Sequence, residues 1–205
     1  MKVSLETRVA PSSGFDVFSV WRFFITGCAC ILVTAADLWT KAWAFELLGG
    51  PGEKPIWWVW EGVFGFQTTL NEGAVFGLGQ GWTNAFTAFG VAATIFLIGW
   101  FVWVAPRNDF WVSLAVGIIL GGIFGNLYDR LGLHGLRWQE AWIAGRPHAV
   151  GEPVYAVRDF ILVMIGPYHW PNFNLADSSL VCGVAGLILR LWMIEGRAAT
   201  HRPSS

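Results

Sequence analysis

Charged side chains are scarce in this sequence of 205 residues. Asp, Glu, Lys and Arg together make up 13% of the chain, whereas soluble proteins usually carry about 25%. Hydrophobic residues make up 55%, with 14 Trp and 16 Phe among the residues of the chain. This composition argues against a water-soluble domain and predicts a membrane protein. Because the net charge is −1 and no basic tract is present, nucleic acid binding is not expected.

Cysteine and histidine are also few. The three cysteines, Cys28, Cys30 and Cys182, all lie inside apolar runs. There they are expected to behave as small hydrophobic residues, and they do not form the pattern of a disulfide framework. The four histidines lie in predicted loops or in the C-terminal tail, without the spacing of metal ligands. We therefore expect neither a metal site nor another cofactor.

Four apolar runs are long enough to cross a bilayer, which takes about 20 residues in a helix. They cover residues 17–41, 84–105, 110–128 and 178–194. The link PRND between the second and third runs is short, which predicts an antiparallel helical hairpin. The sequence therefore predicts an all-α membrane protein with four transmembrane helices, and a single membrane-embedded domain over residues 1–205.

The four predicted helices place both ends of the chain on one side of the membrane. Lys2, Arg107 and Arg197 are among the basic residues on that side, and the positive-inside rule assigns it to the cytoplasm. Segments 42–83 and 129–177 are then external. The first contains KPIWWVWEGVFGFQTTLNEG, whose β-branched and aromatic residues predict a small β-rich segment at the membrane interface. The second is expected to form an extended loop.

Several polar clusters lie at the external ends of the predicted helices or in the external segments, where they can converge on one pocket. They read DLWTK (37–41), NEGAVFG (71–77), GGIFGNLYDR (121–130), VRDF (157–160) and FNLAD (173–177). An ionisable group at membrane depth is costly unless it is paired or used, so such groups indicate function by default.

Some of these residues also have a purely structural interpretation. Asp37 and Lys41 are spaced as an ion pair on one helix face, Asp177 can cap the fourth helix, and Asn71 is typical of a turn. The third predicted helix is harder to explain in this way. Its small residues Ser113, Gly117, Gly121 and Gly125 recur every four positions and allow another helix to approach closely. Gly122, Asn126 and Arg130 share a neighbouring face with Asp129 beside it, and the guanidinium needs an acceptor.

Asp159 and Asp177 suggest a reaction. Two carboxyls brought together at the edge of a low-dielectric layer cannot both ionise easily, so the pair shares a proton. Aspartic proteases activate water with this arrangement. A small proton-coupled transporter also uses intramembrane acids, but it predicts a site near the bilayer midplane, whereas the acids here gather at one face.

Together the five motifs resemble those of the lipoprotein signal peptidase family, the bacterial signal peptidase II enzymes, which are intramembrane aspartic proteases. The resemblance covers most of residues 20–194. It implies an inner-membrane endopeptidase that cuts diacylglyceryl-modified prolipoproteins before the lipidated cysteine, with its active site near the external face. The implied partners are these prolipoproteins and membrane lipids, and the chain is expected to act as a monomer.

Residue by residue, the resemblance implies that Asp159 and Asp177 are the catalytic pair. It gives orienting or supporting roles to Asn71, Gly122, Asn126, Asp129, Arg130, Asn174, Asp37 and Lys41.

The tetrapeptide ITGC at 25–28 looks like a lipoprotein cleavage site, but too few apolar residues precede it for a signal peptide. The 28 residues between Arg130 and Asp159 exceed the usual family link. We interpret this excess as an external elaboration that covers the site, binds a partner or does neither.

Overall fold

The computed structural model describes residues 17–73, 79, 81–143 and 148–200. Its helices are α1 (Val17–Leu48), α2 (Thr83–Trp103), α3 (Phe110–Arg130) and α4 (Leu175–Thr200), and a short 3-10 helix, η2, covers Glu140–Trp142. Its strands are β1 (Trp57–Trp60), β2 (Phe64–Asn71), β3 (Val157–Ile165) and β4 (Tyr168–Phe173). The four α-helices are long and apolar enough to cross a membrane. The predicted set of four helices is thus confirmed.

Helix α3 is the centre of the bundle and packs against α1, α2 and α4. Its small residues make this possible. A Cβ atom on Gly117 would lie 2.5 Å from the carbonyl oxygen of Thr26, and one on Gly121 would lie 2.7 Å from Cβ of Val33. The small-residue face predicted from the sequence therefore receives α1 at close range.

The helices extend beyond the apolar runs that predicted them. Helix α1 continues seven residues past the predicted end at 41, to Leu48, and stops at Gly49. Gly49 has φ +72°, and its amide donates to the Phe45 carbonyl at 3.0 Å, a common way for a helix to end. Helix α4 begins at Leu175, before the predicted start at 178. Asp177, which lies just before the predicted start, consequently belongs to the first turn of α4.

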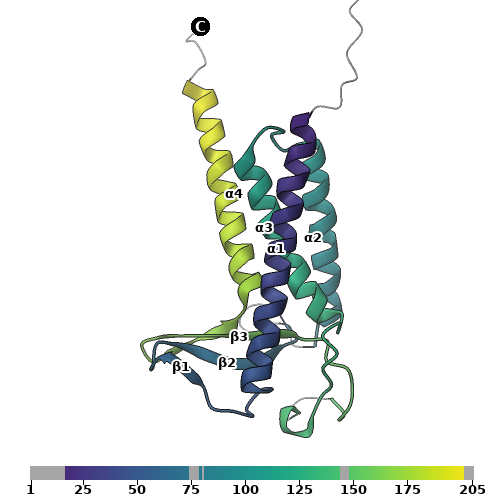
Figure 1. Ribbon diagram of the computed structural model, residues 1–205, viewed down its shortest axis with the longest axis vertical. Coiled ribbons are helices and arrows are strands. Elements are labelled where there is room, and N and C mark those ends of the chain that lie inside the picture. The colour runs from purple at the N-terminus through teal and green to yellow at the C-terminus, as the bar shows by residue number, and fades with distance from the viewer. Residues whose placement is uncertain (1–16, 74–78, 80, 144–147, 201–205) are drawn as a thin grey trace, which may run out of the picture.

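A four-stranded antiparallel sheet lies across one end of the bundle (Figure 1). Its order is β1-β2-β3-β4, and β2 pairs with β3 so that Thr69 is opposite Asp159 and Asn71 is opposite Val157. The β-rich segment expected between α1 and α2 is present, but the sheet does not end there. Segment 129–177, expected as an extended loop, supplies β3 and β4. The sheet thus joins the two segments that carry the polar clusters.

The part of the chain between α3 and β3 has its own apolar core. This core is formed by Leu70, Trp138, Trp142, Val154 and Ala156, with Phe45, Leu136 and Ile143 against it. Leu70 belongs to β2 and Phe45 to α1, so the core attaches this segment to the strands and to the end of α1. The extra residues predicted as an external elaboration are therefore packed against the elements that carry the polar clusters.

Candidate active site

Asp159 lies on β3 and is almost completely buried, with 1% of its surface exposed. One carboxylate oxygen accepts a hydrogen bond from the Asn174 side-chain amide at 2.7 Å. The other oxygen accepts one from the Asn71 side-chain amide at 3.1 Å. Asn71 is the last residue of β2, so the pairing of β2 with β3 brings its side chain to Asp159.

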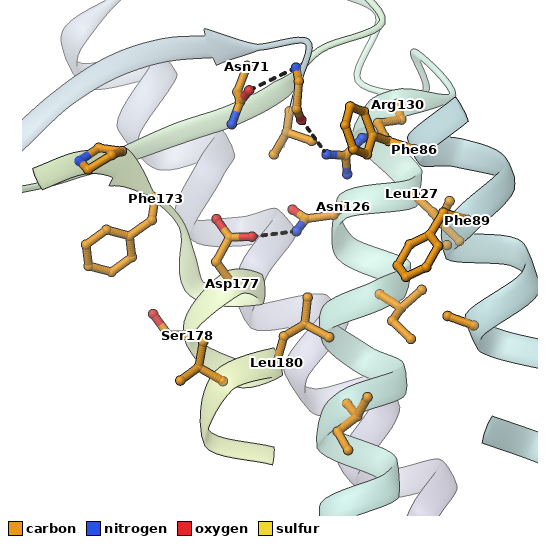
Figure 2. A pocket seen from close by; sticks show the side chains of 18 of the residues that line it. Asn71, Phe86, Phe89, Asn126, Leu127, Arg130, Phe173, Asp177, Ser178 and Leu180 are labelled. Carbon is orange, nitrogen blue, oxygen red and sulfur yellow. Dashed lines mark hydrogen bonds between the residues drawn. The ribbon is translucent and has the colours of Figure 1, made fainter. Parts of the chain in front are cut away.

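Asp177 lies in the first turn of α4. Its carboxylate accepts a hydrogen bond from the Asn126 side-chain amide at 2.8 Å, a contact that is drawn in Figure 2. Asn174 connects the two acids, because its amide group also donates to the Asn126 side-chain oxygen at 3.2 Å. A continuous chain of two asparagine side chains therefore links the Asp159 carboxyl to the Asp177 carboxyl.

The surroundings of Asp159 favour its protonated form. Burial raises the pKa of Asp159 to about 8, and the nearby Asp177 carboxylate adds to the rise. The hydrogen bonds from Asn71 and Asn174 act in the opposite direction, because they stabilise the charged form. Because burial and the Asp177 carboxylate outweigh these hydrogen bonds, Asp159 favours its protonated form at neutral pH.

Lys41 is a buried cation that connects α1 to the polar residues of α3. Its ammonium group lies 2.7 Å from the Asp37 carboxylate and 3.1 Å from the Asp129 carboxylate, and it donates to the Asn126 side-chain oxygen at 3.0 Å. Asp37 in turn accepts from the Ala176 backbone amide at 2.9 Å, which fixes the start of α4 against α1. The pair predicted from spacing is confirmed as a contact, and it reaches α3 and α4 as well.

Asp129 has a supporting position, and its main partner is a residue that the sequence did not single out. Arg158 donates two side-chain hydrogen bonds to one oxygen of Asp129, at 3.0 and 2.8 Å, and its backbone amide donates to the other oxygen at 3.0 Å. Arg158 precedes Asp159 on β3, so this pair fixes the strand at the point where it presents the acid. Arg158 stands within the VRDF motif, but nothing in the sequence indicated its partner.

Arg130 reaches the turn that follows β2. Its guanidinium donates to the Gly73 carbonyl at 3.1 Å and lies 5.7 Å from the centre of the Phe86 ring. The sequence predicted that this guanidinium needs an acceptor, and the acceptor found among the described residues is a backbone carbonyl. Residues 74–78, which include Val75 and Gly77 of the second motif, lie outside the described part of the chain.

Gly122 and Gly125 allow α4 to begin close to α3. A Cβ atom on Gly122 would lie 2.7 Å from the Ala176 carbonyl oxygen. One on Gly125 would lie 2.9 Å from the Asp37 carboxyl carbon and 3.3 Å from the Ala176 Cβ. The close contact brings Asp177 to Asn126, so Gly122 supports the site through backbone approach.

A cavity of about 760 Å³ adjoins these polar groups and continues between α2, α3 and α4 (Figure 2). Its polar end is formed by Asn71, Asn126, Arg130 and Asp177, and its walls include Phe86, Phe89, Ala93, Ile119, Ile123, Leu127 and Leu180. In the described residues no group of His, Cys, Asp and Glu side chains has the arrangement of a metal site. The site thus combines two acids with a large apolar space.

Comparisons with known proteins agree with the resemblance seen in the motifs. A family model described as signal peptidase (SPase) II matches residues 29–193. A lipoprotein signal peptidase from Rhodopirellula baltica is 42% identical over 185 residues, covering 90% of this chain and 78% of the relative. One from Cellvibrio japonicus is 35% identical over 154 residues, covering 72% of this chain and 76% of the relative.

The fold is also that of a solved bacterial membrane enzyme, with a TM-score of 0.65 at 22% sequence identity, covering 91% of this chain and 94% of that one. A second bacterial membrane enzyme gives a TM-score of 0.60 at 26% identity, covering 84% of this chain and 92% of that one. The family model and the relatives settle the assignment: this chain is a peptidase that belongs to the signal peptidase II family.

Proposed function

We propose that the chain is an aspartic endopeptidase whose catalytic pair is Asp159 and Asp177. The observation that carries this proposal is the chain of hydrogen bonds through Asn174 and Asn126 that links the two carboxyls beside the cavity. These acids come from a strand and a helix that are separate elements of the fold. Such a convergence at a large cavity is expected of a catalytic site.

The mechanism follows from the different surroundings of the two acids. We assign the proton that the pair shares to Asp159, because burial raises the pKa of this carboxyl, whereas Asp177 lines the cavity. Asp177 accepts a proton from a water molecule as that water attacks the scissile carbonyl. Asp159 donates its proton toward the developing oxyanion. Asp177 then gives the proton from the water to the leaving nitrogen as the C–N bond breaks, and Asp159 takes its proton back as the new carboxyl group forms. The asparagines hold both carboxyls in place, so little reorganisation is needed at the moment of reaction.

The proposed substrate is a prolipoprotein whose cysteine carries diacylglycerol, cut just before that cysteine. The names of the relatives from Rhodopirellula baltica and Cellvibrio japonicus support a lipoprotein substrate. The apolar walls of the cavity, formed by residues such as Phe89, Ile123 and Leu180, suit the apolar residues of a signal peptide and the lipid group. Lipid chains in the bilayer would hold the substrate near the acids.

The family and the four membrane-capable helices fit a multi-pass protein of the bacterial inner membrane. We place both termini in the cytoplasm and the site near the external face. Arg22, Arg107 and Arg190 support this orientation, because they belong to the end of the bundle opposite the sheet (Figure 1). Reporter fusions should mark Gly135 as external and Asn108 as cytoplasmic; a cytoplasmic signal at Gly135 would contradict the orientation.

One reaction tests the proposed activity directly. Purified protein is incubated with a diacylglyceryl-modified precursor and with the same precursor lacking the lipid. Cleavage of the modified precursor alone, with cysteine as the new N-terminal residue, is the expected result. Absence of cleavage of both would refute the proposed function, and equal cleavage of both would refute the requirement for the lipid.

A further inference from the structure

A histidine of the segment between α3 and β3 contacts the residue next to Asn71. The Nε2 atom of His148 lies 2.7 Å from a carboxylate oxygen of Glu72. With side-chain exposures of 21% for His148 and 12% for Glu72, the contact is largely shielded from solvent. The His148 ring stacks on the Trp138 ring, with 4.3 Å between the centroids and 7° between the planes. The imidazole is therefore held in one orientation, with a nitrogen toward Glu72.

Trp138, on which the His148 ring stacks, is itself held in place by packing and hydrogen bonds. Trp138 is 2% exposed and belongs to the apolar core that also contains Leu70 of β2. Its backbone amide donates to the Glu152 carbonyl at 2.9 Å, and its carbonyl accepts from the Gly151 amide at 2.8 Å. These bonds join the two sides of the segment, so His148 projects from a packed and hydrogen-bonded structure.

Glu72 lies in the middle of a turn that determines how Asn71 faces Asp159. The Asn71 side-chain oxygen accepts from the Gly73 amide at 3.0 Å, while its side-chain amide donates to Asp159 at 3.1 Å. The backbone of the turn is also held, because Thr83 donates to the Glu72 carbonyl at 3.1 Å and Arg130 donates to the Gly73 carbonyl at 3.1 Å. Figure 2 shows the side-chain oxygen of Asn71 and the guanidinium of Arg130 meeting this turn from two sides.

These bonds hold Asn71 and the backbone of the turn, and the contact with His148 also holds the side chain of Glu72. If the turn rotates, the Asn71 amide leaves Asp159 and the Gly73 carbonyl leaves Arg130. We propose that His148 and Glu72 are positioning residues for the reaction, which keep the 71–73 turn in the orientation where Asn71 donates to Asp159. This proposal rests on the proposed function of Asp159, and it assigns a task to part of the segment that lengthens the link between α3 and β3.

The test compares the kcat of His148→Ala with that of a second His148 variant, a Glu72 variant and a control variant. His148→Ala removes the contact and should lower kcat about tenfold, with little change of KM. His148→Gln restores an N–H donor near the Nε2 position and should recover most of kcat. Glu72→Ala should match His148→Ala, because it breaks the same contact. Glu152→Gln is the control, because Glu152 is 53% exposed and its carboxylate lies 3.7 Å from His148 on the other side of the ring; it should leave kcat unchanged.

A second measurement separates positioning from a general effect on folding. In the Asn71→Ala background, His148→Ala should reduce kcat by less than about twofold further, since the orientation that it protects has already been lost. A full additional tenfold loss in that background would overturn the proposal. So would unchanged kcat of both His148→Ala and Glu72→Ala in the wild-type background, or failure of His148→Gln to recover activity when its thermal midpoint matches the wild type.

A spectroscopic measurement keeps this proposal distinct from the proposed function. The side-chain amide signal of Asn71, assigned by its absence in Asn71→Ala, is recorded by NMR in detergent. It should shift in His148→Ala and Glu72→Ala and stay in place in Glu152→Gln. If the signal shifts in His148→Ala and Glu72→Ala but the wild type cleaves no precursor, only the proposed function is refuted. If the signal does not shift in these two variants, the positioning role is refuted.

Discussion

Asn174 and Asp177 cap the start of α4 reciprocally. The Asn174 side-chain oxygen accepts a hydrogen bond from the Asp177 backbone amide at 2.9 Å. The Asp177 carboxylate accepts one from the Asn174 backbone amide at 3.3 Å. This is the geometry of a capping box. The same asparagine also donates to Asp159, so one residue fixes the helix end and aligns both acids.

Asn174 should therefore have two separable effects. Asn174→Ala removes the cap and the bridge, and we expect a loss of about 1 kcal/mol in stability and a fall of about a hundredfold in kcat. Asn174→Ser restores a good cap but provides no amide for Asp159. It should recover the thermal midpoint without recovering kcat, as measured by thermal unfolding in detergent and by cleavage assays. Joint recovery of both quantities would contradict the bridging role.

Gly122 tests the close contact of α3 with α4. In Gly122→Ala the new Cβ would lie 2.7 Å from the Ala176 carbonyl oxygen, so the start of α4 must move away. We expect a cost of about 1 to 3 kcal/mol and a marked loss of cleavage, because Asp177 moves with the helix. Gly186→Ala on α4 is the matched control, since a Cβ at that position would meet nothing within 4 Å; it should cleave like the wild type. Normal cleavage by Gly122→Ala would contradict this account.

Lys41 is the buried cation between two buried carboxylates. Lys41→Met leaves Asp37 and Asp129 without their shared charge partner, and removing one partner of a buried ion pair costs about 3 to 5 kcal/mol. The expected result is a large fall in thermal midpoint and in the yield of folded protein. Lys54→Met, at an exposed lysine, should change the stability by less than about 0.5 kcal/mol. Equal stability of the two variants would show that the buried network contributes little.

The local parts of this site could be predicted from the sequence. The Asp37 and Lys41 contact follows from a spacing of four residues on one helix. Asp177 was expected to cap a helix that starts at 178, but α4 already begins at Leu175, so Asn174 is the capping residue and Asp177 bonds back to it from the first turn. The four helices follow from the length and composition of the runs. In each case the signal lies within a few neighbouring residues.

The remaining contacts depend on the tertiary fold. Arg158 and Asp129 are 29 residues apart and His148 and Glu72 are 76 apart, so no local pattern indicates that they meet. Strand β3 was missed for a different reason. Its sequence VRDFILVMI ends in a continuous run of apolar residues without alternation, and such a run cannot be identified by periodicity alone.

The raised pKa of Asp159 predicts how stability depends on pH. Because the pKa of Asp159 rises from 3.8 to about 8 on folding, the folded state binds the proton more tightly than the unfolded state between these values. The contribution of Asp159 to the free energy of unfolding is therefore greatest below about pH 4. It decreases as the pH rises toward 8, by up to about 1.4 kcal/mol per pH unit. Asp159→Asn removes this dependence.

The thermal midpoint of Asp159→Asn minus that of the wild type should therefore increase from pH 5 to pH 8 and then level off. The measurement is thermal unfolding in detergent at a series of pH values. Cleavage by the wild type should decrease above about pH 8, because the shared proton is then lost. A midpoint difference that stays constant over this range would contradict the assignment of the proton to Asp159.

The most direct test of the catalytic pair is cleavage of a diacylglyceryl-modified precursor by Asp159→Asn, Asp177→Asn and the double variant. Each substitution keeps the size of the side chain and removes its ability to hold and transfer a proton. Each single variant should remain folded and lose activity by about a thousandfold or more. Since the two carboxyls act as one unit, the double variant should be hardly worse than either single variant. Wild-type activity of folded Asp159→Asn, or losses that multiply in the double variant, would contradict the proposed pair.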